Sequence, residues 1–236
     1  MNLKLILFLL FFGILFNLGI SQTTFYKTTD GILMTEENYL QIKKEMSERE
    51  DLAGRYQEIL IKTENRNDTI IKTIQFDQIP VVLKENNKRY DPYAEQRKLI
   101  GTHFPIELFQ DETGNNFTAD FLHDKPTLVN FWFTNCPPCI EEIPDLHKLK
   151  KEFGDSVNFI AITFENQKTV EKFLKKHPKF DYNHITDSKK SISELKIKTY
   201  PMTFLLNKDG EILNVYGALM FNLPENLKQL LDLLCN

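Results

Sequence analysis

Cysteine is scarce in this sequence of 236 residues, which contains three cysteines and none before position 136. A small exported domain stapled by disulfides would carry more cysteines at wide spacings, so the sequence excludes a structural disulfide framework. Cys136 and Cys139 are separated by two residues, a spacing that is typical of a reactive pair. We interpret Cys235, the penultimate residue, as a terminal apolar residue rather than a third redox partner.

An excess of positive charge is also missing. The formal net charge is -4 at pH 7 and the isoelectric point is near 5.8. A protein that binds nucleic acid usually concentrates basic side chains that attract the phosphate backbone. Nucleic acid is therefore not an expected partner. The sequence also shows no repeat and no low-complexity tract.

Metal-ligand spacing is absent among the five histidines, which are His103, His123, His147, His177 and His184. A four-coordinate zinc site at the cysteine pair would need a second pair of ligands of suitable type, and neither the histidines nor Cys235 supplies one. We therefore expect no metal and no bound cofactor. Half of a zinc site and an inert structural disulfide remain alternative interpretations of the pair.

The first 21 residues have the composition of a secretory signal peptide. Lys4 precedes an apolar run from Leu5 to Ile20, and small residues stand at Gly19 and Ser21. This pattern predicts cleavage after Ser21. A membrane anchor formed by residues 5–20 is the alternative, although the run is shorter than the roughly 20 residues of a spanning helix. In both cases we expect the remaining chain in the periplasm or another extracytoplasmic compartment, where disulfides persist.

Sequence patterns divide the remaining chain into three parts. Residues 22–76 have the mixed pattern of a small α+β accessory unit, and residues 77–98, with two prolines and little periodicity, are typical of a linker. Residues 99–236 form the third part. In the accessory unit we expect an extended start (Thr23–Thr28), a helix (Glu36–Glu50) and a hairpin (Tyr56–Thr63 with Thr69–Phe76).

Strand and helix patterns alternate in residues 99–236, which predicts an α/β fold with a central sheet and helices on both faces. Thr127–Phe133 is nearly continuously apolar, as a strand buried on both sides would be. The expected order is a hairpin (104–109 with 116–121), this strand, a helix after the cysteines that ends at Gly154, a strand (157–164), a helix (168–176), a strand (183–186), a helix (191–195), strands 201–207 and 211–216, and a helix (223–234).

The position of the cysteine pair between this strand and the next helix indicates its chemistry. The amides and dipole of a helix N-terminus stabilise Cys136 as a thiolate, which is the nucleophile of disulfide exchange. Cys139, one turn into the helix, can attack the mixed disulfide and release the reduced substrate. Pro137 and Pro138 suit the first helical turn, where a missing N–H is tolerated.

Three motifs resemble those of the TlpA-like and ResA-like branch of the thioredoxin superfamily, an AhpC/TSA-redoxin type of domain, and they follow one another along the chain in the order found in that branch. They are the segment from Phe104 through Gly114 to Pro126, then Leu128–Cys139 followed by Glu141–Pro144, and then Tyr200–Gly210. The resemblance covers residues 100–236 and leaves the accessory unit outside. It implies a thioredoxin-like fold in which a leading N-terminal hairpin precedes a central mixed sheet flanked by helices.

The resemblance also assigns roles to individual residues. It implies that Cys136 attacks, that Cys139 resolves, and that the two form a redox-active disulfide facing a cis Pro201. Glu142, three residues beyond Cys139, would carry a proton during activation of Cys139; its alternative role is that of a solvated acid at the helix start.

Two further residues would contact the substrate. The Tyr200 backbone beside Pro201 could pair with an extended substrate segment. For Trp132 the position in the family favours a place at the rim of the site, with packing in the core as the alternative.

We expect an exported thiol-disulfide oxidoreductase that reduces disulfides of extracytoplasmic proteins, with apocytochrome c as one candidate, and that takes electrons from a membrane donor. The same fold and motif can also oxidise, so the direction stays open. A peroxiredoxin-like thiol peroxidase is less favoured, because Thr134 lies two residues before Cys136 rather than three, and no arginine follows position 97. A non-catalytic thioredoxin-like binding module or a copper carrier is the third alternative, but copper carriers of this fold typically use a wider cysteine spacing with a histidine.

Overall fold

The computed structural model describes residues 22–49, 55–79, 82–83, 89–218 and 225–235. The predicted leader, residues 1–21, lies outside these ranges. Within them, no helix has both the length and the apolar character needed to cross a membrane.

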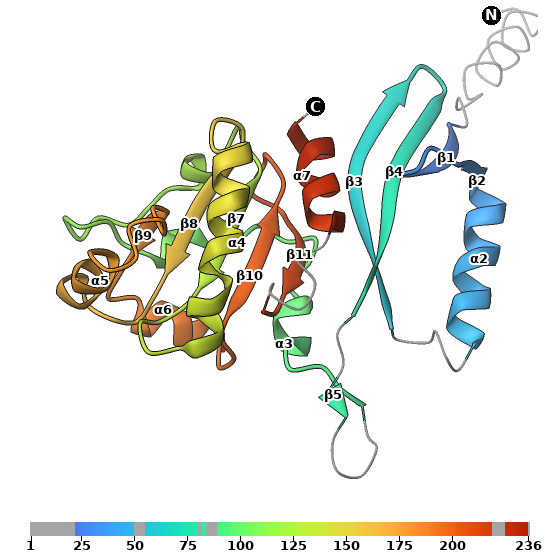
Figure 1. Ribbon diagram of the computed structural model, residues 1–236. Helices are drawn as coiled ribbons and strands as arrows, with labels where there is room; N and C mark the ends of the chain where they lie inside the picture. Colours follow the sequence, from blue (N-terminus) through green and yellow to red (C-terminus); the bar gives the residue numbers. More distant parts are fainter. Residues whose placement is uncertain (1–21, 50–54, 80–81, 84–88, 219–224, 236) are drawn as a thin grey trace, which may run out of the picture.

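A five-stranded mixed sheet forms the centre of the C-terminal part (Figure 1). Its order is β11-β10-β7-β8-β9, with β7, β8 and β9 parallel and β10 antiparallel to both β7 and β11. All residues of β7 are buried, as predicted for a strand covered on both faces. The strands are β7 Thr127–Phe131, β8 Asn158–Ile162, β9 Asn183–Ile185, β10 Met202–Leu206 and β11 Ile212–Tyr216.

Helices pack on both faces of this sheet, which confirms the predicted α/β fold. They are α4 Pro137–Phe153, α5 Gln167–Leu174, α6 Lys189–Glu194 and α7 Glu225–Cys235. Successive residues of β7 point to opposite faces, so Leu128 joins the core beneath α4 and α7, whereas Val129 joins the core on the α6 side. Helix α4 ends beside Gly154, where a Cβ would lie 2.6 Å from the carbonyl oxygen of Lys150.

The segment before β7 reverses direction as predicted but forms less sheet than expected. The carboxylate of Asp111 accepts hydrogen bonds from the backbone N–H groups of Thr113 (2.9 Å) and Asn115 (3.0 Å), which fixes the turn. Only one isolated bridge, Gln110 with Asn116, joins the two arms. Two 3₁₀ helices, η1 Ile106–Leu108 and η2 Ala119–Leu122, stand where strands were predicted.

The accessory residues form a second sheet of four strands with the order β2-β1-β4-β3 (Figure 1). Its elements are β1 Thr23–Thr28, β2 Leu33–Thr35, α2 Glu36–Glu48, β3 Tyr56–Arg66 and β4 Thr69–Gln78. The predicted extended start, helix and hairpin are therefore confirmed. The side chain of Thr35 caps α2 by accepting from the backbone N–H of Asn38 (3.3 Å), and Tyr26 and Tyr39 stack between sheet and helix.

Strand β3 joins the accessory sheet to the C-terminal part. Figure 1 shows α7 beside β3, and Ile59 and Ile61 of β3 share one buried core with Leu227 and Leu231 of α7. The apolar core of the C-terminal part therefore includes side chains from the accessory sheet.

Polar contacts strengthen this junction. Asp77 of β4 accepts hydrogen bonds from Asn214 Nδ2 (3.1 Å) and from the Tyr216 hydroxyl (3.2 Å), both on β11. Burial, with the charge of Asp77, holds the pKa of Tyr216 well above its usual value. The Arg97 guanidinium donates to the carbonyl oxygen of Val215 (2.6 Å) and pairs with Asp91 (2.8 Å).

The predicted linker, residues 77–98, contains short elements. These are the end of β4, β5 Val82–Leu83, β6 Arg89–Tyr90 and α3 Ala94–Arg97. The division of the chain into domains at these boundaries stays a prediction.

Candidate active site

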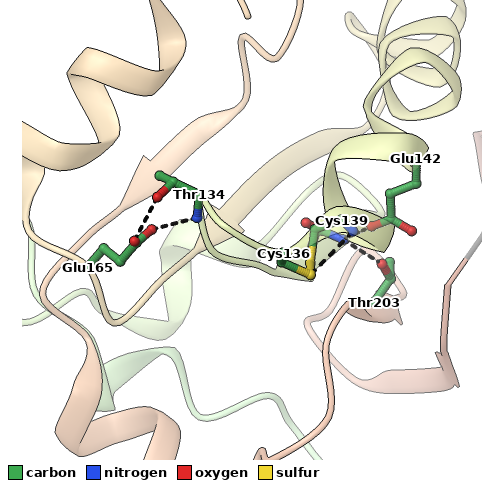
Figure 2. Close-up of a disulfide and its surroundings, with 7 residues drawn as sticks. Thr134, Cys136, Cys139, Glu142, Glu165 and Thr203 are labelled. Carbon is green, nitrogen blue, oxygen red and sulfur yellow. Dashed lines mark hydrogen bonds between the residues drawn. A yellow bond between two sulfur atoms is a disulfide. The ribbon is translucent and has the colours of Figure 1, made fainter.

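Cys136 and Cys139 form a disulfide at the N-terminus of α4, with their Cα atoms 5.2 Å apart (Figure 2). Cys136 is the N-cap residue of the helix, and its sulfur accepts from the backbone N–H of Cys139 at 3.3 Å. Pro137 and Pro138 occupy the first helical turn. The sequence places the helix start here because prolines are favoured where an N–H would have no partner. The same N–H and helix dipole would stabilise a thiolate on Cys136 after reduction.

The oxidised pair offers little surface, since Cys136 is 3% exposed and Cys139 is 2% exposed. A reaction partner must therefore approach this edge of the sheet closely. The surface around the sulfur atoms then takes part in selecting the partner.

Glu142 lies one helical turn beyond Cys139 and is completely buried, whereas its neighbour Glu141 is exposed. The inward orientation rules out the alternative of a solvated acid at the helix start. The Asn130 side-chain amide donates to Glu142 Oε1 at 2.8 Å and to the Thr203 hydroxyl at 3.0 Å. Figure 2 shows Glu142 and Thr203 beside the cysteine pair. Three elements, β7, α4 and β10, thus hold one buried carboxylate near the disulfide.

Asn130 and Thr203 had no predicted role, although both are polar residues within strands that are otherwise apolar. That contrast was the available signal, because a polar residue in a buried strand needs a hydrogen-bond partner. The strand pairing supplies it, since Asn130 and Thr203 are direct neighbours across β7 and β10.

Glu165 holds the loop before Cys136 and was not predicted from the sequence. Its carboxylate accepts from the backbone N–H of Thr134 at 2.7 Å and from the Thr134 hydroxyl at 2.8 Å (Figure 2). Glu165 follows β8 and Thr134 follows β7, so the two bonds tie together the loops at the ends of adjacent parallel strands. Charge-assisted bonds of this kind are among the stronger hydrogen bonds in proteins.

Pro201 lies directly before β10, and the Tyr200–Pro201 peptide bond is cis, which confirms that prediction. Met202 pairs with Phe131 across the sheet, so Pro201 stands at the edge where β7 leads into the cysteine loop. Tyr200 is half-buried, and burial raises the pKa of its phenol.

Trp132 belongs to the core rather than to an open rim. Its side chain is 1% exposed and its ring packs edge-on against Phe180 and His184. Trp132 directly follows β7 and joins the same buried core as Leu128, four residues earlier. The structure thus places Trp132 in the core, the alternative given for this residue, and a contact of Trp132 with substrate stays a prediction.

In the described ranges, no group of three or more histidine, cysteine and acidic side chains could hold a metal ion. Cys235 is free and exposed at the end of α7. Burial lowers the pKa of His184, whose ring packs against Phe180.

Comparison with known proteins gives consistent matches. Residues 100–215 match a family model described as the AhpC/TSA family. The chain is 30% identical over 150 residues to the thioredoxin-like protein YneN of Bacillus subtilis, which covers 61% of this chain and 86% of the relative. It is also 30% identical over 127 residues to the thiol-disulfide oxidoreductase ResA of Halalkalibacterium halodurans, covering 52% of this chain and 72% of the relative. Among solved structures, StoA from Bacillus subtilis aligns with a TM-score of 0.41 and 28% identity, covering 57% of this chain and 98% of StoA.

Proposed function

Because the chain belongs to the thioredoxin-like thiol-disulfide oxidoreductases, and is therefore an enzyme of disulfide exchange, we propose that it reduces disulfides of exported proteins through Cys136 and Cys139. The observation that carries this proposal is the disulfide at the N-terminus of α4 beside a completely buried Glu142. The apolar run of residues 5–20 supports a place outside the cytoplasm.

The reaction begins with the reduced enzyme. The Cys136 thiolate attacks one sulfur of the substrate disulfide, forming a Cys136–substrate mixed disulfide and breaking the substrate S–S bond. The departing substrate sulfur leaves as a thiolate and takes up a proton. The N–H of Cys139, which faces the Cys136 sulfur at 3.3 Å in the oxidised form, favours the thiolate that starts this step.

The second step closes the enzyme disulfide. Cys139 loses its proton and attacks the Cys136 sulfur, so the Cys136–Cys139 bond forms and the second substrate thiol is released. Two electrons pass from enzyme to substrate. We assign Glu142 as the group that accepts the Cys139 proton, because it lies one turn further along the same helix and is shielded from solvent.

A dithiol donor returns the two electrons by the same exchange in reverse. We propose a membrane protein as this donor. The substrate segment would lie along Pro201 and pair with the Tyr200 backbone, at the sheet edge that leads to the disulfide. Apocytochrome c is one substrate of the proposed class.

The test is the reduction potential of the full chain, measured by equilibration with dithiothreitol and glutathione buffers. A reductase should lie near the thioredoxin value of about -270 mV, whereas a strong oxidant lies near about -120 mV. A value at the oxidising end would overturn the proposed direction. Trapping with Cys139→Ser would then identify which exported proteins attach to Cys136.

A further inference from the structure

Three aromatic side chains meet beside the disulfide, and we name Phe133, Phe164 and Tyr200 the aromatic trio. The ring centres of Phe133 and Phe164 are 5.5 Å apart, those of Phe133 and Tyr200 5.3 Å, and those of Phe164 and Tyr200 6.1 Å. Each ring therefore contacts both of the others at distances and tilts typical of favourable aromatic pairs.

The trio lies at the edge of the sheet that carries the redox pair. Phe133 follows β7, and its carbonyl oxygen accepts from the backbone N–H of Cys136 at 3.2 Å. Phe164 follows β8, and Tyr200 immediately precedes the cis Pro201. Because β7 and β8 are parallel and β10 runs opposite to β7, these three loops emerge at the same edge.

The trio is apolar and partly open to solvent. Phe164 is 38% exposed, and Phe133 and Tyr200 are half-buried. By contrast, Phe131 and Phe204 of the same sheet are completely buried. Burial raises the pKa of the Tyr200 phenol, so the trio carries no charge at neutral pH. An aromatic surface left open next to a reaction centre is typical of a binding surface rather than of a core.

We propose that the aromatic trio binds a bulky apolar side chain of the substrate polypeptide, within a few residues of the cysteine that Cys136 attacks. This inference rests on the proposed function, because disulfide exchange brings a substrate sulfur to Cys136. The residues next to that sulfur must then pass over the surface that surrounds the disulfide. An extended chain advances about 3.3 Å per residue, so residues one to three positions from the cysteine lie within roughly 10 Å of it along the substrate chain.

The substrate class that follows is a flexible or unfolded segment whose cysteine has an aromatic or large aliphatic neighbour. In a folded protein such side chains are mostly buried, whereas an unfolded exported chain presents them. The trio therefore favours disulfides in incompletely folded proteins over small hydrophilic disulfides.

The test compares two disulfide-linked homodimeric peptides that differ only in the residue next to cysteine, Phe in one and Ser in the other. Both sulfurs of each peptide carry the same neighbour, so the result does not depend on which sulfur is attacked. Pre-reduced full-length enzyme is mixed with each peptide in a stopped-flow instrument, and the second-order rate constant is measured. Wild-type enzyme should react about fivefold to tenfold faster with the Phe peptide.

The variant Phe164→Ala should reduce this preference to less than about twofold, whereas Phe164→Leu should retain part of it. The readout is the ratio of two rate constants on one enzyme, so a general loss of activity from loosened packing cancels. Leu108→Ala, which removes a partly exposed apolar side chain from η1, is the matched control and should keep the wild-type ratio.

Three outcomes would overturn the inference and leave the proposed function standing. The first two are equal rates with both peptides in wild-type enzyme, and an unchanged preference in Phe164→Ala. A dimer that Phe164→Ala converts to monomers in sedimentation velocity would also overturn it, because a second copy would then cover the trio. If the wild-type enzyme exchanges with neither peptide nor glutathione disulfide, the proposed function itself fails and the inference fails with it.

Discussion

Asn130 donates its side-chain amide to the carboxylate of Glu142 at 2.8 Å, and both residues are buried behind the disulfide. Glu142 is therefore held in one position by a strand residue that lies twelve positions earlier in the chain. A carboxylate fixed in this way can exchange a proton with a neighbouring sulfur without first reorganising.

Replacement of Glu142 tests that role. We expect Glu142→Gln to slow closure of the mixed disulfide by roughly one hundredfold or more, because general acid-base catalysis contributes about 10²–10⁴-fold. The glutamine oxygen can still accept from Asn130, so the fold should persist. The rate is measured as release of the second thiol in a single turnover, across a range of pH. Glu141→Gln, an exposed neighbour on the same helix, is the control. Equal effects of the two replacements would contradict a specific role for Glu142.

The two hydrogen bonds from Thr134 to the Glu165 carboxylate predict that Glu165 stabilises the loop before Cys136. Glu165→Ala should cost about 1–2 kcal/mol of unfolding free energy, because charge-assisted hydrogen bonds contribute about this much at a partly buried position. It should also change the rate at which iodoacetamide alkylates Cys136 in the reduced enzyme. Thr134→Val removes only the hydroxyl bond and should have a smaller effect. A larger effect of Thr134→Val than of Glu165→Ala would show that the carboxylate does not hold the loop.

The burial of Ile59 predicts that the accessory sheet stabilises the C-terminal part of the chain. Its side chain is 1% exposed and packs in the core that contains α7. Ile59→Ala should lower the free energy of unfolding by about 2–4 kcal/mol in urea titrations of the oxidised enzyme. Leu60→Ala, which removes the adjacent side chain at 44% exposure, should change it by less than about 0.5 kcal/mol. Two separate unfolding transitions, with only the first shifted by Ile59→Ala, would contradict a shared core.

The lowered pKa of His184 predicts that the stability of the fold depends on pH. Burial lowers its pKa from the usual 6.5, with a smaller opposing effect of the hydrogen bond to the Phe180 carbonyl oxygen. The unfolded chain therefore binds more protons than the folded chain between the lowered pKa and 6.5. The stabilising contribution is complete above pH 6.5 and is lost as the pH falls toward the lowered value.

The midpoint temperature of thermal unfolding should therefore fall more steeply for the wild type than for His184→Gln as the pH is lowered from about 7 to about 5. Curves for His184→Gln that run parallel to the wild type would exclude this linkage.

Local patterns in the sequence predict much of the fold. The apolar run of β7, the cysteines that follow it and the helical spacing of α4 together locate the redox pair. The pair of Thr134 and Glu165 could not be found in this way, because it joins residues 31 positions apart that share no periodic pattern. The predicted hairpin around Asp111 shows a different limit of sequence reasoning. Turn residues predict that the chain reverses direction, but they do not predict how many residue pairs on either side of the turn form β-bridges.

Trp132 shows why proximity in sequence to the cysteines is an incomplete guide. Trp132 directly follows β7 and packs with Leu128 into the core beneath α4. Packing into a core, rather than distance along the chain, decides which aromatic residues stay open to a partner.

The contacts of the accessory sheet also determine when parts of the chain can fold during synthesis. Asp77 and Asn214 are 137 positions apart, and β3 packs against α7, which follows it by more than 150 residues. Contacts between such distant segments form late, because a long loop must close before they contribute. Synthesis proceeds from the N-terminus, so Ile59 and Ile61 of β3 stay uncovered until α7 has been made.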